Sequence, residues 1–121
     1  MKTILLIEDD PFLVEIYTTQ LKAAGYKVNV ANNVEEALRK TREAKPDLVI
    51  LDIVLPKVDG WEFLKAIRQD SQLKDLKVVI LSNLGQKEEI DKGVGFGAIK
   101  YFIKAEHTPR EVVEEIKEIL K

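Results

Sequence analysis

Residues 48–63 read LVILDIVLPKVDGWEF and contain a strand, a turn and the start of a helix. The continuous apolar run at 48–51 is typical of a strand buried on both faces of a sheet. A turn at 57–60 leads into the helix predicted at 61–70. Asp52 ends the apolar run, and burial of an unpaired carboxylate is costly. This residue therefore needs either a partner or a function.

The same order of strand and then helix repeats along the whole chain. Strands are predicted at 3–7, 26–31, 48–52, 77–82 and 98–104, and helices at 11–24, 34–44, 61–70, 86–94 and from 109 onward. Strands joined through helices of this length pair in parallel by right-handed crossovers. The fold class is therefore α/β, a doubly wound five-stranded parallel sheet with helices on both faces, as in the flavodoxin-like three-layer sandwich.

Capping residues indicate where three of the helices begin, and glycines indicate which helix is weakest. The pair Asp10-Pro11 predicts an N-cap with proline at the first helical position, and 33–36 and 108–111 read as capping boxes. The helix at 86–94 is weak because each glycine near its end costs about 1 kcal/mol relative to alanine. We expect this helix to be the movable one.

Composition limits the function classes. A chain of 121 residues with 45% hydrophobic residues is one domain long. It has no cysteine, and His107 is its only histidine, so disulfides, thiolate metal sites, Cys-His pairs and metal sites with several histidines are excluded. We expect His107 to be solvated and without a role.

The charge distribution and the N-terminal sequence narrow the class of protein further. The 19 basic and 21 acidic residues form no block or stripe, which argues against direct nucleic-acid binding. The sequence MKTILLIEDDPF resembles neither a signal peptide nor a membrane span. We expect a soluble cytoplasmic protein and a single domain over 1–121 without an attached output domain.

Polar residues follow four of the predicted strands, at the edge where doubly wound sheets carry their sites. They are Glu8, Asp9 and Asp10 at the end of the first strand, Asp52 at the end of the third, Ser82 at the end of the fourth and Lys104 at the end of the fifth. Clustered carboxylates repel unless a cation joins them, and an all-oxygen ligand set favours Mg²⁺. Such a site suits phosphoryl transfer, with Asp52 as nucleophile forming an acyl phosphate. Lys104 and Ser82 would then contact the phosphoryl oxygens.

Four separated stretches of the sequence resemble the receiver domain of two-component response regulators. They are the acidic pair after the first strand, the aspartate in LVILDIVLPKVDG, the serine in ILSN, and GAIKYFIK with its tyrosine and lysine. The resemblance covers essentially the whole chain and implies the strand order 2-1-3-4-5. It also implies that Asp9 holds the metal directly and Glu8 mainly through water, with the backbone carbonyl of Val54 completing the site.

The resemblance further implies a phosphorylation switch. Asp52 would accept phosphate from a histidine kinase or phosphotransfer domain, and the protein would catalyse this step and a slow autodephosphorylation without being a conventional enzyme. Ser82 would swing toward the phosphoryl group, Tyr101 would follow it inward, and Ser82 and Lys104 would gain contacts only when that group is present. An unknown downstream protein would read the face of the helix at 86–94, the strand at 98–104 and the last helix, a face that could equally support a homodimer. Its expected residues are Lys87, Glu88, Ile90, Asp91, Ile99, Tyr101 and Arg110.

Two positions depart from the family pattern, and two others bear on the lifetime of the phosphoryl group. Ala105 replaces the usual proline after the lysine, so we expect a trans Lys104-Ala105 bond and an altered loop. Asn83 replaces a small residue after the serine and would narrow access to the site. Val54 and Leu84 occupy the two positions that flank attacking water, and neither can act as a general base. We therefore expect a long-lived phosphoryl group.

Purely structural roles for these residues and other classes of function are alternatives. Glu8 and Asp9 could simply favour the first helix end, a role we keep for Asp10. Trp61 is expected to pack as an ordinary first-turn helix residue. The strongest rival function is a receiver-like interaction module that does not depend on phosphorylation. A flavin or nucleotide binder lacks its phosphate loop, because EDDPF would repel a phosphate, and an aspartyl phosphatase lacks its second acid at Val54.

Overall fold

The computed structural model describes all residues, 1–121. The strands are β1 (Thr3–Ile7), β2 (Lys27–Ala31), β3 (Leu48–Leu51), β4 (Val78–Ser82) and β5 (Lys100–Ile103). The helices are α1 (Pro11–Ala23), α2 (Val34–Glu43), α3 (Gly60–Arg68), α4 (Lys87–Gly95) and α5 (Pro109–Ile119). The predicted alternation of strands and helices is confirmed. The main differences in bounds are that α3 ends at Arg68 and that β5 ends at Ile103, so Lys104 lies in the loop beyond its strand.

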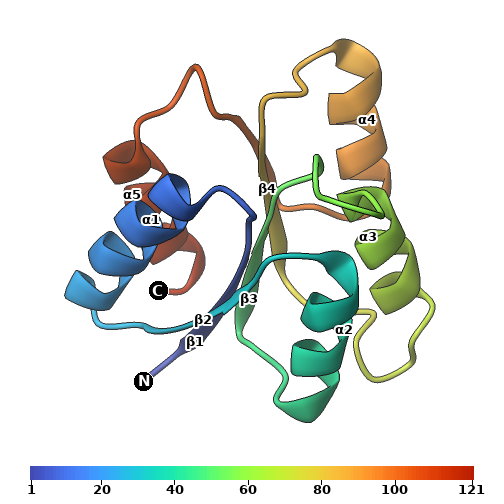
Figure 1. Ribbon diagram of the computed structural model, residues 1–121, viewed down its shortest axis with the longest axis horizontal. Helices are drawn as coiled ribbons and strands as arrows, with labels where there is room; N and C mark the ends of the chain where they lie inside the picture. The colour runs from blue at the N-terminus through green and yellow to red at the C-terminus, as the bar shows by residue number, and fades with distance from the viewer.

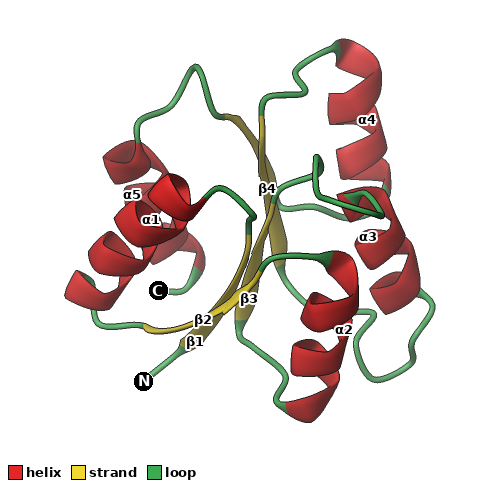
Figure 2. Ribbon diagram, viewed as in Figure 1, coloured by secondary structure: helices red, strands yellow, loops and turns green.

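All five strands are parallel and lie in the order β2-β1-β3-β4-β5, as predicted. Figure 1 shows the sheet nearly edge-on, with α1 and α5 on one face and α2, α3 and α4 on the other. The same three layers stand out by colour in Figure 2. This is the doubly wound flavodoxin-like architecture, and every strand therefore ends at the same edge of the sheet.

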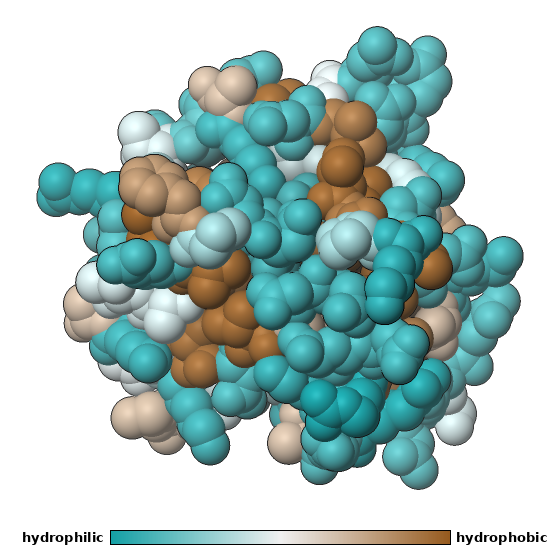
Figure 3. Space-filling model, viewed as in Figure 1, coloured by the Kyte–Doolittle hydropathy of each residue, from teal (hydrophilic) through white to brown (hydrophobic).

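The core consists of two apolar clusters, one on each face of the central strands. β1, β3 and β4 are buried along almost their whole length, which explains their continuous apolar sequences. One cluster packs under α2 and α3 around Phe63, and the other packs under α1 and α5 around Leu21. Polar side chains cover most of the face in Figure 3, where apolar side chains gather in a few patches. None of the helices combines the length and the hydropathy that a membrane span requires.

Capping fixes the helix starts largely as the sequence predicts. The Asp10 side chain accepts a hydrogen bond from the Phe12 N–H, and Thr108 and Glu111 form a complete capping box. The predicted box at Asn33 is only half formed. Its side chain accepts from the backbone N–H of Glu36, but the Glu36 carboxylate accepts from Asn32 instead of Asn33.

The outer edge of β2 is closed by a side chain from the neighbouring helix. β2 pairs only with β1, so the backbone groups of alternate residues, including Val30, point away from the sheet. The Lys40 ammonium of α2 donates a hydrogen bond to the Val30 carbonyl. The edge strand is thus partly capped by a lysine.

Candidate functional site

Two carboxylates lie side by side where β1 and β3 end. Glu8 and Asp52 directly follow these neighbouring strands, which pair up to Ile7 and Leu51. The backbone ladder continues one residue further, because the Asp52 N–H donates to the Ile7 carbonyl over 3.0 Å. Glu8 is only 2% exposed and Asp52 only 4%. Both carboxylates therefore sit at the floor of the site.

Lys104 joins the two carboxylates into one buried ion cluster. Its Nζ lies 2.8 Å from Glu8 Oε1 and 2.8 Å from Asp52 Oδ2. The backbone N–H of Lys104 donates to the Ser82 carbonyl over 2.9 Å, which fixes the start of the side chain beside β4. The ammonium thus pairs with Asp52 and Glu8 before any phosphoryl group is present, and its contact with such a group stays a prediction. Two buried negative charges without a cation would repel, which is the physical reason for this contact.

The loop after Lys104 does not prevent this reach. The chain contains no cis peptide bond, so the Lys104-Ala105 bond is trans, as predicted. The chain turns immediately beyond β5, where the Glu106 N–H donates to the Ile103 carbonyl over 2.9 Å. His107 is not simply solvated, contrary to expectation. Its ring packs edge-on against Phe102, with centroids 5.4 Å apart.

The electrostatics of the cluster identify Glu8 as the group that exchanges a proton near neutral pH. Burial raises the pKa of Glu8 to about 7, an effect that the Asp52 charge reinforces and the hydrogen bond from Lys104 opposes. Burial alone would lower the pKa of Lys104, but its hydrogen bonds to Asp52 and Glu8 outweigh that effect and raise it. Lys104 therefore stays an ammonium while Glu8 takes up a proton as the pH falls.

The donor set at this edge fits a hard cation. Oxygen atoms of Glu8, Asp9 and Asp52 all lie within 4.8 Å of one another. Glu8 and Asp52 are buried, whereas Asp9 is exposed at the rim, where it can be approached from solvent. Carboxylate oxygens without nitrogen or sulfur ligands suit Mg²⁺ better than a transition metal. The residues present therefore fit the predicted ion.

Ser82 and Tyr101 meet at one peptide group in the loop after β4. Ser82 is fully buried, and its Oγ accepts a hydrogen bond of 3.3 Å from the Leu84 N–H. The Tyr101 hydroxyl on β5 donates to the Leu84 carbonyl. Burial raises the pKa of the Tyr101 hydroxyl, and the charges of Glu89 and Asp52 act in the same direction. The loop is thus held between the two predicted switch residues.

The remaining predicted positions line the rim. Val54 is 58% exposed, and its backbone N–H donates to Asp52 Oδ1 over 3.2 Å. Leu84 is half-buried and Asn83 is exposed. The side chains of Val54 and Leu84 are apolar, so the rim offers no general base at either position.

Sequence reasoning missed one residue that positions the site, Gly60. A Cβ at Gly60 would lie 2.6 Å from the Asp52 carbonyl oxygen and 2.9 Å from Ile53 Cα. The backbone N–H of Gly60 donates to the Ile53 carbonyl over 2.7 Å. The start of α3 therefore packs directly on the backbone that carries Asp52. The Asp-Gly pair at the turn was the available signal, but it indicates a turn and not a close approach.

Comparisons with known proteins agree with this geometry. The family model described as response regulator receiver domain matches residues 4–117. The alkaline phosphatase synthesis transcriptional regulatory protein PhoP of Bacillus subtilis is 40% identical over 99% of this chain and 49% of its own length. The phosphate regulon transcriptional regulatory protein PhoB of Escherichia coli is 31% identical over 99% of this chain and 52% of its own. The chain thus spans about half the length of these relatives.

Solved structures are similar along the whole chain. Chemotaxis protein CheY4 of Vibrio cholerae has a TM-score of 0.89 and 28% identity, covering 98% of both chains. A two-component response regulator of Clostridium difficile has the same TM-score and identity, covering 99% of this chain and 96% of its own. The agreement extends over all the elements that carry the site.

Proposed function

The chain belongs to the response regulator receiver domain family, and on that premise we propose that Asp52 accepts a phosphoryl group from the histidine of a kinase or phosphotransfer domain in a Mg²⁺-dependent reaction. The observation that carries the proposal is the contact of Lys104 with both Asp52 and Glu8 at the floor of the site. A buried aspartate held by a lysine and a second acid has the groups that acyl phosphate formation requires.

The transfer is a displacement at phosphorus. An oxygen of Asp52 forms a bond to phosphorus, the bond between phosphorus and the donor imidazole breaks, and the imidazole nitrogen keeps the electron pair. Asp9, Glu8, Asp52 and the Val54 carbonyl are the proposed holders of Mg²⁺, which would neutralise charge on the phosphoryl oxygens. Lys104 supplies a second positive charge from the loop after β5 and orients Asp52 through its 2.8 Å contact.

The output would be a shift between two arrangements of the loop after β4. In the present arrangement the Ser82 hydroxyl accepts from the Leu84 N–H and Tyr101 donates to the Leu84 carbonyl. A phosphoryl group on Asp52 offers Ser82 a charged acceptor, so the hydroxyl would turn toward it and release Leu84. A downstream protein or a second copy would read the change on α4, β5 and α5. We place this switch in the cytoplasm, as part of the proposal.

Loss of the phosphoryl group should be slow. Val54 and Leu84 would flank the site with apolar side chains, and Asn83, which is exposed, would narrow the approach. Water attacking the acyl phosphate would find no side chain at these positions to remove its proton. The phosphorylated form would therefore outlive the encounter with its kinase.

One observation favours the rival function, a docking module independent of phosphorylation. Lys104 already contacts both buried carboxylates, so the fold pairs them without an ion or a phosphoryl group. In this case the α4, β5 and α5 face would bind a partner in a single arrangement.

Mass spectrometry separates the two functions. The intact protein is incubated with acetyl phosphate and Mg²⁺, beside Asp52→Asn and a sample containing EDTA. A single phosphoryl adduct that requires both Mg²⁺ and Asp52 supports the phosphoacceptor function. No adduct, together with no response to beryllofluoride, would leave the docking module as the better description.

A further inference from the structure

Helix α4 rests on the sheet through a single buried residue. Gly93 is the only residue of α4 that is buried. A Cβ there would lie 2.8 Å from Ile80 Cδ1 and 2.9 Å from Tyr101 Cδ2, so the helix backbone touches the sheet side chains directly. With so little buried surface, the position of α4 depends on what holds its two ends.

Side chains from the start of α3 hold the C-terminal end of α4. The Trp61 ring stacks on the Phe96 ring, with centroids 6.3 Å apart and an angle of 26° between their planes. The Lys92 ammonium lies 4.7 Å from the centroid of the same Trp61 ring. These contacts join one helix to the last turn of the other through a stacked pair and a cation–π contact.

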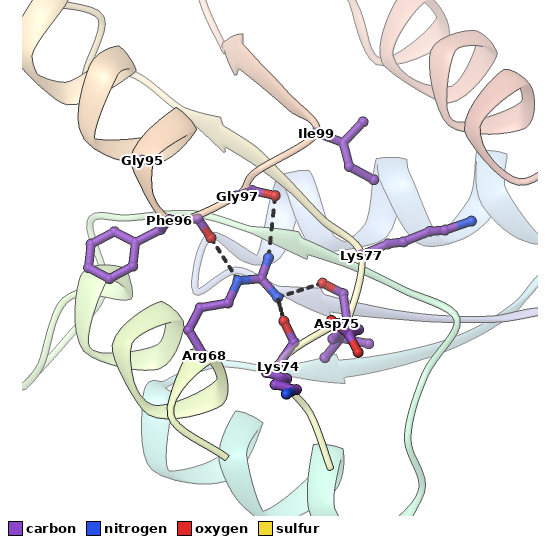
Figure 4. Close-up of a pocket in the computed structure, with 9 residues that line it drawn as sticks. Arg68, Lys74, Asp75, Lys77, Gly95, Phe96, Gly97 and Ile99 are labelled. Atoms are coloured by element: carbon purple, nitrogen blue, oxygen red, sulfur yellow. Dashed lines mark hydrogen bonds between the residues drawn. The ribbon is translucent and has the colours of Figure 1, made fainter. Parts of the chain in front are cut away.

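Arg68, at the other end of α3, holds the same point. Its Nε donates to the Phe96 carbonyl over 2.7 Å, and its Nη2 lies 3.4 Å from the Gly97 carbonyl (Figure 4). Its Nη1 donates to the carbonyls of Leu76 and Lys74 over 2.7 and 2.9 Å. These bonds lie in a hollow of about 570 Å³, but the guanidinium is occupied by backbone carbonyls. Arg68 therefore works as a clamp and not as an anion site.

The N-terminal end of α4 is held differently: Leu84 packs on the core and a Cβ at Gly85 would lie 2.8 Å from Ile103 Cδ1, but no side chain of a neighbouring helix clamps this end. Asn83, Gly85 and Gln86 are exposed, and the capping box of α4 joins Gln86 only to Glu89 of the same helix. The hydrogen bond from Tyr101 to the Leu84 carbonyl ties this end to the sheet. That bond belongs to the loop which Ser82 is proposed to release.

We propose that α4 is a lever anchored at Phe96 by Trp61, Lys92 and Arg68, so that phosphorylation moves its N-terminal end and leaves its C-terminal end in place. The inference rests on the proposed phosphoacceptor function and deepens it by locating the moving part. The nine residues of α4 make a lever about 13 Å long. The surface that changes is then the loop after β4 and the first turns of α4, not the whole helix.

Pairs of nitroxide labels test the lever directly, because the chain has no cysteine of its own. One label replaces Lys65 on the exposed face of α3, and the second replaces either Glu88 or Val94, which are exposed near opposite ends of α4. Distances are measured with Mg²⁺ alone and with Mg²⁺ and beryllofluoride, and occupancy of the latter is checked by titration. We expect the distance to Glu88 to change by about 2 Å or more and the distance to Val94 to stay constant.

Any other pair of distance changes would refute the lever. The titration with beryllofluoride shows separately whether the proposed phosphoacceptor function fails. Equal changes at both positions would mean that α4 moves as a whole. No change at either position, with beryllofluoride bound, would refute the lever but leave Asp52 as a phosphoacceptor. Failure of beryllofluoride to bind would remove the proposed function and the lever together.

Substitution of residues that hold the C-terminal end of α4 tests the anchor, with a second lysine of α4 as the matched control. Lys92→Ala removes the cation over Trp61, whereas Lys87→Ala removes a lysine of the same helix that pairs only with the exposed Asp91. In Lys92→Ala we expect a second distance population between the labels on Lys65 and Val94, enriched about two- to fivefold over its level in the unaltered chain. Lys87→Ala should leave this distribution unchanged. A single unchanged population in Lys92→Ala, and also in Trp61→Leu, would show that these residues do not anchor α4.

Discussion

Replacing Lys104 by methionine would test the buried ion cluster most severely. Methionine keeps most of the side-chain volume but leaves Glu8 and Asp52 facing each other without a cation. The lysine side chain is 16% exposed and makes two contacts of 2.8 Å, so its removal breaks a largely buried pair. We expect the free energy of unfolding at pH 8, in EDTA, to fall by about 3 kcal/mol, the lower end for a broken buried ion pair.

The pH dependence gives the sign of the effect. Burial raises the pKa of Glu8 to about 7, above its value of 4.5 in an unfolded chain, and loss of Lys104 removes an interaction that lowers it. The folded state therefore holds the proton more tightly, and stability is lost as the pH rises through 7. Between the unfolded and the folded pKa the slope approaches about 1.4 kcal/mol per unit for one proton, and it falls to about half of that where the pH equals the folded pKa. The loss caused by Lys104→Met should thus be clearly smaller at pH 6 than at pH 8.

Urea unfolding followed by the fluorescence of Trp61 provides the measurement. Lys87→Met is the matched control, because the Lys87–Asp91 pair is also 2.8 Å long but its side chains are 85% and 63% exposed. It should change stability by less than about 0.5 kcal/mol. Mg²⁺ at 100 times its dissociation constant should restore up to about 2.7 kcal/mol to Lys104→Met. A loss below about 1 kcal/mol at pH 8, or an equal loss at both pH values, would refute the cluster as described.

Three further outcomes follow from the site and its support. Val54→Glu places a general base beside Asp52 and should shorten the lifetime of the phosphoryl group at least about tenfold, as followed by intact mass over time. Gly60→Ala should weaken Mg²⁺ binding, measured by calorimetry, because its Cβ would meet the Asp52 carbonyl at 2.6 Å; Gly95→Ala, where a Cβ meets nothing within 4 Å, should leave binding unchanged. Thr108→Ala should lower the free energy of unfolding by about 1 kcal/mol through loss of the α5 cap, as measured by urea titration.

The fold could be predicted because its signals are local and repeat. Apolar runs such as 3–7 and 48–51 indicate strands buried on both faces, and helical spacing between them leaves a parallel sheet as the consistent architecture. The edge at which Glu8, Asp52, Ser82 and Lys104 gather follows from this topology alone.

Contacts across elements could not be predicted in the same way. The pairing of Lys104 with Glu8 depends on where a long side chain turns after β5, and the stacking of Trp61 on Phe96 depends on how two helices lie over one face. The same holds for His107, whose packing against Phe102 has no local sequence signal. Helix α3 ends at Arg68, before the predicted end at residue 70, because a turn forms there instead. The Asp70 carbonyl accepts hydrogen bonds from the N–H groups of Leu73 and Lys74.

The contact of Lys40 with the Val30 carbonyl also bears on how this protein behaves at high concentration. An unpaired edge of a parallel sheet is a template on which another chain can add a strand, and such additions propagate into fibres. An incoming strand would have to displace the Lys40 ammonium and bring its own backbone next to a positive charge. A single lysine on α2 thus acts as a gatekeeper against intermolecular strand addition, at the edge of the sheet opposite β5.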